Sequence, residues 1–399
     1  MCGKNKHRIL FLNFWAQNPG GAEFSLIDLI SETSKNNETW LLSSENGKLT
    51  EEVQKNGSTK CIVIPFEKSI NRLRRDKLFL LIIVNLKLIV SFLLYVFKCK
   101  KMILKIKPDI IHANVPKSHM ILLLLNIMGY SGKMIFHIRE IFPEKSFALF
   151  LYSVLFPHKN TKAIAVSNAV YNSLPERIQK RTTVIYNGIN VNVKTCREQF
   201  SAPRFLYLGR IVPWKKCEIL IEAFARLVTE YGLRAGNFDL AGGTFYADES
   251  YREMLKNLIE NYNLSAKVNL LPHTDHPETL YSSHNIFCIA SGSEPFGRVI
   301  AEAQAYGMPV IAFNSGAAGE IVVDKTNGIL VDKCLPENFC SAMALLIENP
   351  SLAASMGKNG QKRCRELFNK DTQLPILAKY LTENNTDTKQ LKPELRSWK

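Results

Sequence analysis

The chain has 399 residues and contains none of the short patterns that mark disulfide-stapled, zinc-binding or secreted proteins. Its nine cysteines include no C-x-x-C pair, and none has a histidine at zinc-ligand spacing. This predicts free thiols in a reducing compartment. Residues 1–8 are polar, and the apolar run Ile9–Trp15 is shorter than the apolar part of a secretory signal. We therefore expect a cytoplasmic protein.

Motifs for metal ions, nicotinamide cofactors and nucleic acids are missing as well. No D-x-D motif stands where it could bind a metal ion, and no G-x-G-x-x-G follows the first predicted strand, which ends at Phe14. His273 and His276 lie in a polar segment that we expect to be a turn. There is no helix-turn-helix, zinc-knuckle or RNA-binding pattern. We expect no metal, no cofactor and no nucleic-acid partner.

Acidic residues are scarce in the first half of the chain only. Residues 1–190 hold 27 basic and 13 acidic side chains, a net charge of +14, whereas residues 191–399 hold 24 and 23, a net charge of +1. The basic half is expected to face something anionic, and an anionic membrane surface is the predicted partner. The densest basic clusters are Arg72, Arg74, Arg75, Lys77 and Lys98, Lys100, Lys101, Lys105, Lys107.

These clusters flank the most apolar stretch of the protein, Leu78–Phe97, in which 17 of 20 residues are apolar. A run of this length could span a bilayer, lie in the interface between lipid and water, or be a buried core helix. A span would put the first strand and Glu294 on opposite sides of the membrane, and both flanks are equally basic. We therefore expect an interfacial helix. His119–Tyr130 and Ser146–Phe156 are further apolar runs that either extend this face or pack on a sheet.

Two series of short apolar runs alternate with helical segments. This alternation is typical of parallel sheets covered on both faces. The predicted strands are Arg8–Phe14, Thr39–Leu42, Lys60–Pro65, Ile110–Ala113, Met134–Ile138, Ala163–Val166 and Thr183–Ile185, then Arg204–Leu208, Phe238–Ala241, Val268–Leu271, Ile286–Ala290, Val310–Ala312 and Ile329–Val331. The expected α/β domains are residues 1–195 and 200–370, with a hinge at 187–203. Each is a Rossmann-like, doubly wound sheet, and ligands would bind in a cleft between the two.

The segment Ser293–Glu302, which reads SEPFGRVIAE, is the strongest chemical signal. Pro295 suits the first position of a helix, and Gly297 lets a ligand approach the backbone. The amides of Gly297, Arg298 and Val299 would then face a phosphate. At about 100° per residue, Glu302 would lie two turns along the helix and about 80° round from Glu294. The two acids would accept hydrogen bonds from hydroxyls on opposite sides of that phosphate, as in a sugar–diphosphate–nucleoside.

Six segments in a fixed order resemble the retaining, family 4-like glycosyltransferases of the GT-B fold. Glu294 and Glu302 match the E-x7-E signature, and the segment Gly209–Lys215 is similar to the family's G-R-x4-K. The other segments are Val184–Ile189, Leu240–Gly243, Gly307–Ala312 and Gly316–Val322. The chain departs from the family at Lys216, where glycine is usual, and at Arg298, where a small or apolar residue is common.

The resemblance implies the role of each matching residue. Arg210 and Lys215 would stabilise the leaving diphosphate, Glu294 would bind the donor sugar and Glu302 the ribose, with Asn187, Phe296, Gly297, Arg298 and Val299 completing the donor site. The anomeric configuration would be retained without a protein nucleophile or a metal ion. A C-terminal helix at about residues 371–388 would return to the first domain.

In the first half, Gly20 and Gly21 form a loop that opens a helix. This loop is either a tight turn or a backbone cradle for a phosphate. His137, at a predicted strand end, corresponds in kind to a histidine that the family places near the donor sugar; a buried structural role is the alternative. His112 is a weaker candidate, and Arg139 and Glu140 could meet the acceptor.

Together these features predict a retaining glycosyltransferase with a UDP- or GDP-type nucleotide sugar and a lipid-linked or saccharide acceptor, used to build a surface polysaccharide or glycolipid. It would act as a peripheral protein on the inner face of the cytoplasmic membrane. A nucleotide-sugar 2-epimerase shares the fold but has no use for a membrane-facing basic half. A catalytically inactive, membrane-associated partner would be expected to lose Arg210, Lys215 or a glutamate, and all are present.

Overall fold

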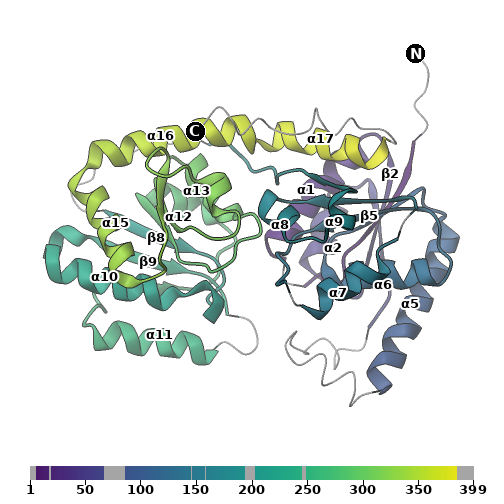
Figure 1. Ribbon diagram of the computed structural model, residues 1–399, viewed down its shortest axis with the longest axis horizontal. Helices are drawn as coiled ribbons and strands as arrows, with labels where there is room; N and C mark the ends of the chain where they lie inside the picture. Colours follow the sequence, from purple (N-terminus) through teal and green to yellow (C-terminus); the bar gives the residue numbers. More distant parts are fainter. Residues whose placement is uncertain are drawn as a thin grey trace. The chain divides into compact units, whose positions relative to one another are not determined.

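The computed structural model describes residues 6–17, 19–66, 86–144, 146–157, 159–193, 203–244 and 249–383 (Figure 1). The described chain forms two compact units. The first takes in the chain up to Val166, then Val170–Ile185 and the chain from Leu374. The second contains Ser167–Ala169 and Tyr186–Gln373. Arg72, Arg74, Arg75, Lys77, residues 78–85 of the apolar run and residues 194–202 of the expected hinge lie outside the described residues.

The first unit is built on a seven-stranded sheet in the order β3-β2-β1-β4-β5-β6-β7, with every neighbouring pair parallel. Its strands are β1 (Arg8–Leu12), β2 (Glu38–Ser43), β3 (Thr59–Val63), β4 (Ile110–Ala113), β5 (Lys133–Ile138), β6 (Thr161–Ala165) and β7 (Thr182–Val184). The helices between them are α1 (Gly21–Ser34), α2 (Lys48–Lys55), α5 (Leu86–Ile106), α6 (Pro116–Ile127), α7 (Phe147–Leu155), α8 (Asn168–Asn172) and α9 (Glu176–Gln179).

The second unit has a six-stranded parallel sheet in the order β10-β9-β8-β11-β12-β13. Its strands are β8 (Arg204–Leu208), β9 (Asn237–Ala241), β10 (Val268–Leu271), β11 (Ile286–Ile289), β12 (Val310–Phe313) and β13 (Gly328–Val331). Its helices are η2 (Pro213–Lys215), α10 (Cys217–Tyr231), η3 (Gly232–Ala235), α11 (Glu249–Asn261), α12 (Pro277–Ser283), α13 (Arg298–Ala305), α14 (Ala318–Ile321), α15 (Pro336–Glu348) and α16 (Pro350–Leu367). The predicted fold class, two Rossmann-like parallel-sheet domains, is confirmed.

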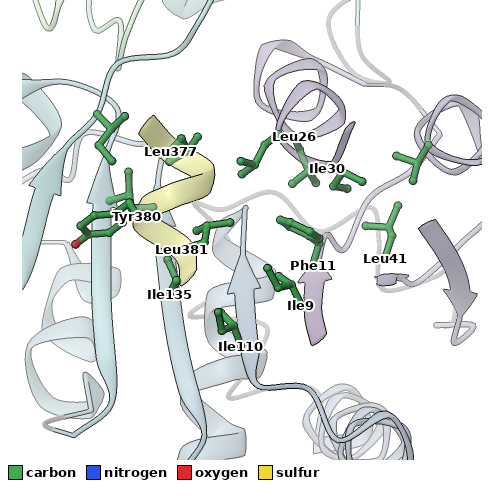
Figure 2. Packing of buried hydrophobic residues seen from close by; sticks show 14 of the residues in the cluster. Ile9, Phe11, Leu26, Ile30, Leu41, Ile110, Ile135, Leu377, Tyr380 and Leu381 are labelled. Carbon is green, nitrogen blue, oxygen red and sulfur yellow. The ribbon is translucent and has the colours of Figure 1, made fainter. Parts of the chain in front are cut away.

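One face of the first sheet is covered by α1 and by the C-terminal helix α17 (Lys370–Thr382). Figure 2 shows Leu377, Tyr380 and Leu381 of α17 above Ile135, and Leu26 of α1 near Phe11. The two residues that β1 contributes to this core, Ile9 and Phe11, are spaced by two, because alternate side chains of a strand share a face. Burying each such side chain stabilises the unit by about 1.5–3 kcal/mol.

Helix α5 contains the second half of the long apolar run. Tyr95, Val96 and Cys99 on one side are buried, whereas Leu94 and Phe97 are more than half exposed. In the part of the chain that the structure describes, no helix is both long and apolar enough to cross a membrane.

Candidate active site

The candidate donor residues follow two neighbouring strands of the second sheet. Arg210 and Lys215 come after β8, and Glu294 comes after β11. These strands lie side by side at the point where the strand order reverses direction. In doubly wound sheets, ligands bind at the carboxyl ends of the strands at such a switch point. Topology therefore places the two loops where a ligand site is expected.

Lys215 and Glu294 form a buried ion pair. The Lys215 ammonium donates a hydrogen bond to Glu294 Oε1, and both side chains are about one-tenth exposed. The ammonium also lies 4.3 Å from the centre of the Trp214 ring. An ammonium carries three N–H donors, so Lys215 can keep Glu294 and still donate to a second anion. The spacing in the sequence did not predict this direct contact.

The loop before α14 fixes the backbone of Glu294. The amide of Ala317 donates to the Glu294 carbonyl at 2.8 Å. Gly316 has φ +58°, and a Cβ added there would lie 2.5 Å from the Glu294 carbonyl oxygen. Only glycine permits this approach. The close contact with Glu294 therefore gives a structural reason for the glycine that begins the segment Gly316–Val322.

Substituting Gly316 tests that support. We expect Gly316→Ala to destabilise the protein and to lower activity by displacing Glu294. Gly57→Ala is the matched control, because Gly57 has φ +68° but no atom within 4 Å of its added Cβ. That control should lose only the about 1–2 kcal/mol of backbone strain. Urea unfolding and turnover would be measured for both, and equal losses in the two variants would contradict the close contact.

The expectation for the helix start is wrong in one respect. Helix α13 begins at Arg298 with Gly297 at φ +88° as its N-cap, so Pro295 is not the first helical residue and Glu294 lies in the preceding loop. The positive φ at Gly297 turns the chain sharply before the helix, which proline could not do at that position. The first helical hydrogen bond is donated by Ile300 to the Gly297 carbonyl. The amides of Arg298 and Val299 therefore belong to the first turn, as an anion site requires.

Glu302, one turn further along α13, already has two partners. Tyr281 donates to one carboxylate oxygen at 3.0 Å, and Arg298 Nε donates to the other at 2.7 Å. Tyr281 is buried and stacks on Tyr306, with ring centres 5.3 Å apart. Arg298 thus pairs with Glu302 and orients it. Each carboxylate oxygen has a second acceptor site, so hydroxyl groups can still bind there.

Arg210 is exposed, and hydrogen bonds hold the backbone of its loop in place. The buried Tyr207 hydroxyl donates to the Arg210 carbonyl at 2.7 Å. The amide of Ile211 donates to the carbonyl of Gly243 at 3.1 Å, which ties this loop to the loop after β9. Lys216 adopts φ +54°, the left-handed conformation that glycine favours. The loop therefore keeps the tight turn even though lysine replaces the family's glycine.

Two predicted donor residues have buried side chains. The Phe296 side chain is buried against Tyr186 and Phe368, at ring distances of 6.1 and 5.6 Å. Asn187 is buried in the loop after β7, next to Tyr186. The Phe296 side chain can act only by holding its loop in place.

In the first unit, Gly20 is the N-cap of α1 and Gly21 its first residue. The Gly20 amide donates to the Glu23 carboxylate at 2.9 Å, so an acidic side chain already occupies one donor of the proposed cradle. A phosphate bound there would have to displace or tolerate this carboxylate.

A largely buried polar cluster lies at the carboxyl ends of β1, β4 and β5. On each of these strands, its residues follow core residues that share the same face of the sheet. The rows read Ile9, Phe11, Asn13 from β1; Ile110, His112, Asn114 from β4; and Ile135, His137, Arg139 from β5. Side chains two residues apart share a face, so each row changes from apolar to polar towards the end of its strand, with His112 and His137 still inside β4 and β5. Strands β1 and β4 are adjacent where the strand order reverses, so this cluster also lies at a switch point.

Burial favours the neutral form of the histidines in and around this cluster. Burial, followed by the charge of Arg139, lowers the pKa of both His112 and His137 well below the usual histidine value. Burial also lowers the pKa of His119 to about 4. His137 Nδ1 lies 3.1 Å from His112 Nε2 and 3.4 Å from an Arg139 amino nitrogen.

The structure thus brings Lys215, Glu294 and the α13 start together in the second unit, and places His137 and the Gly20–Gly21 loop in the first. Asn13 and Asn114 were missed by sequence reasoning. Both directly follow an apolar strand, and a polar residue at that position was the signal that could have identified them.

Two sheets of this topology in one chain define the GT-B class of fold. The structure of HepE from Anabaena in complex with UDP-glucose is similar, with a TM-score of 0.78 at 22% identity over 94% of this chain and 99% of that chain. At this level of identity, the likeness establishes the fold alone.

The sequence matches two family models in succession. The model described as Glycosyltransferase Family 4 matches residues 19–193, and that described as Glycosyl transferases group 1 matches residues 197–363. The chain is a glycosyltransferase of the GT-B fold. This favours a transferase over an epimerase.

Curated relatives agree with that assignment. An uncharacterized glycosyltransferase of Methanocaldococcus jannaschii is 29% identical over 68% of this chain and 75% of its own length. The capsular polysaccharide biosynthesis glycosyltransferase CapM of Staphylococcus aureus is 27% identical over 67% of this chain and 76% of its own.

Proposed function

We propose that the protein transfers a sugar from a UDP- or GDP-type nucleotide sugar with retention of the anomeric configuration. The observation that carries this proposal is the Lys215–Glu294 ion pair at the switch point of the second sheet, in the loop that leads into α13. Lys215 would contact the diphosphate, Glu294 the sugar, and the amides at the start of α13 a phosphate. The HepE structures with UDP and UDP-glucose support a donor of this kind.

The chemical task at this site is to stabilise negative charge that grows on the leaving diphosphate. Lys215 and Arg210 supply two positive charges, and the amides of Arg298 and Val299 supply oriented donors. Glu294 binds hydroxyls of the donor sugar, and Glu302, held by Arg298 and Tyr281, binds the ribose. These cations take the place of a divalent ion. The incoming hydroxyl is assisted by the leaving phosphate, so no side chain acts as nucleophile.

The donor class can be tested by thermal shift with a panel of nucleotide sugars and nucleoside diphosphates. Binding to the folded state alone raises stability by about 2.7 kcal/mol at a hundred times Kd. We expect one base to be preferred and EDTA to leave the shift unchanged. Release of nucleoside diphosphate only when an acceptor is added would separate a transferase from an epimerase. Absence of any shift would contradict the proposal.

We further propose that the acceptor is a lipid-linked saccharide at an anionic membrane, where the protein is peripheral on the inner face of the cytoplasmic membrane. Nine of the fifteen large apolar side chains exposed in the described parts of the chain lie on α5, α6 and α7, among them Phe97, Ile127 and Phe150. Helices α5, α6 and α7 lie next to one another (Figure 1). Lys100 of α5 donates to the carbonyl of Met128, the C-cap of α6, and Tyr152 of α7 forms a hydrogen bond with His119 of α6.

The charge on α5 matches this partner. Val90, Leu93, Leu94 and Phe97 recur on one exposed stripe, and Lys98, Lys101 and Lys105 continue it towards the end of the helix. An apolar half followed by a basic half suits a helix that inserts at one end while its lysines meet lipid phosphates. Helix α7 adds a pair of stacked exposed rings, Phe147 and Phe150.

Changing Lys98, Lys101 and Lys105 to Gln tests the membrane surface. At about 1 kcal/mol per residue, binding to anionic vesicles should weaken on the order of 100-fold. Added salt should weaken the wild type similarly. Lys256→Gln, on the exposed face of α11, is the matched control and should change nothing. Donor binding in solution should be intact in all variants. Equal binding of the triple variant and the wild type would refute the surface.

A further inference from the structure

The strongest unassigned feature is the hydrogen-bond chain across the carboxyl ends of β1, β4 and β5. Asn114 donates from Nδ2 to Asn13 Oδ1 at 3.0 Å, and Arg139 Nε donates to Asn114 Oδ1 at 2.9 Å. Asn13 in turn donates to the Trp15 carbonyl at 2.5 Å. Because a carbonyl only accepts and a guanidinium only donates, the direction of every bond in this chain is fixed.

The same logic points to one tautomer for each histidine. Arg139 donates to His137 Nδ1, so this nitrogen carries a lone pair and the single proton of the neutral ring lies on Nε2. His112 Nε2, which also contacts His137 Nδ1, must then be the donor of that bond. The lone pair of His112 lies on Nδ1.

Without Arg139 the histidine pair would have two nearly equivalent states. Either His112 donates to His137, or His137 Nδ1–H donates to His112 and leaves a lone pair at His137 Nε2. In the described residues, neither His137 Nε2 nor His112 Nδ1 has a hydrogen-bond partner, so these atoms do not select between the states. Arg139, anchored by the buried Asn114, is compatible with only the first state.

We propose that Arg139 is a positioning residue that holds His137 as its Nε2–H tautomer, so that His137 offers a proton and not a lone pair to a substrate oxygen. The tautomer itself follows from the contacts of the first unit alone. Its effect on turnover rests on the proposed function and on the prediction from the family resemblance that His137 lies near the donor sugar.

The tautomers can be observed by nitrogen-15 NMR of histidine side chains, with His137→Gln to assign the signals. In the wild type we expect both His137 and His112 to carry their protons on Nε2. A proton on Nδ1 of His137 would overturn the proposal, and this measurement requires no variant of Arg139.

Arg139→Lys and Arg139→Met form a matched pair of similar length. Lysine keeps a donor-only head group, whereas methionine has no donor. We expect Arg139→Lys to retain the His137 tautomer and most of kcat, and Arg139→Met to mix the tautomers and lower kcat roughly 10–100-fold, a modest share of what a positioned proton donor contributes. Loss of activity with an unchanged tautomer in Arg139→Met would refute the positioning role. Mixed tautomers with full activity would instead refute the contact of His137 with the donor.

Discussion

Replacing Lys215 or Arg210 by Ala should lower kcat by about 10²–10³-fold, the loss expected when one preorganised donor to a developing negative charge is removed. Arg210 is exposed, so its variant should fold normally. Lys215→Ala also leaves Glu294 buried without its cation, which costs about 3–5 kcal/mol when a buried pair is broken. Turnover of the donor with and without EDTA would be measured for both variants.

The control for Lys215→Ala is the double variant Lys215→Ala with Glu294→Gln, in which no charge is left buried. If stability returns while turnover falls well below that of Glu294→Gln alone, the lysine acts on the reaction and not merely on folding. Lys256→Ala should have no effect, since Lys256 is exposed on α11 and its ion pair in the described residues is with Glu253 of the same helix. Full activity of Arg210→Ala or Lys215→Ala, or strict dependence on a divalent ion, would refute the proposed leaving-group site.

Substitutions of the two glutamates are expected to cause different kinetic defects. Glu294→Gln should lower kcat, because this side chain meets the sugar that is transferred and anchors Lys215. Glu302→Gln should raise the donor KM with little change in kcat, because ribose contacts are equally strong in ground and transition states. Steady-state kinetics with varied donor concentration distinguishes the two effects.

Arg298→Ala is the informative companion to Glu302→Gln. Arg298 donates to the Glu302 carboxylate, so its loss should reproduce part of the KM increase. Identical kinetic defects for Glu294→Gln and Glu302→Gln would leave the two roles unsupported, and wild-type rates in both would remove the E-x7-E assignment.

The fold could be predicted from the sequence because each buried strand is a short apolar run between helical segments. The run Ile110–Ala113 is a strand with the predicted bounds, and so is Arg204–Leu208. The start of α13 was wrong because the local preference of Pro295 for a first helical turn competes with a left-handed residue at Gly297. Sequence pattern indicates which residues suit a helix start, but the surrounding loop decides which of them is used.

The chemistry of the site was less accessible to sequence analysis. Lys215 and Glu294 are 79 positions apart, and their contact depends on β8 and β11 being neighbours in the sheet. Asn13, Asn114 and Arg139 converge for the same reason from three strands. Glu23 was not among the predicted site residues, yet its carboxylate accepts a hydrogen bond from the Gly20 amide. The pairings between strands are tertiary and leave no spacing in the sequence, whereas the Gly20–Glu23 contact is local and has the spacing of a capping box.

The most direct test of the central claim is the binding of nucleoside diphosphates to the wild type and to Arg210→Ala, measured by calorimetry with EDTA present. The account predicts that UDP or GDP binds the wild type without a metal ion and that Arg210→Ala weakens this binding at least tenfold, or about 1.4 kcal/mol. Equal affinity of the two proteins, or binding that disappears with EDTA, would contradict it.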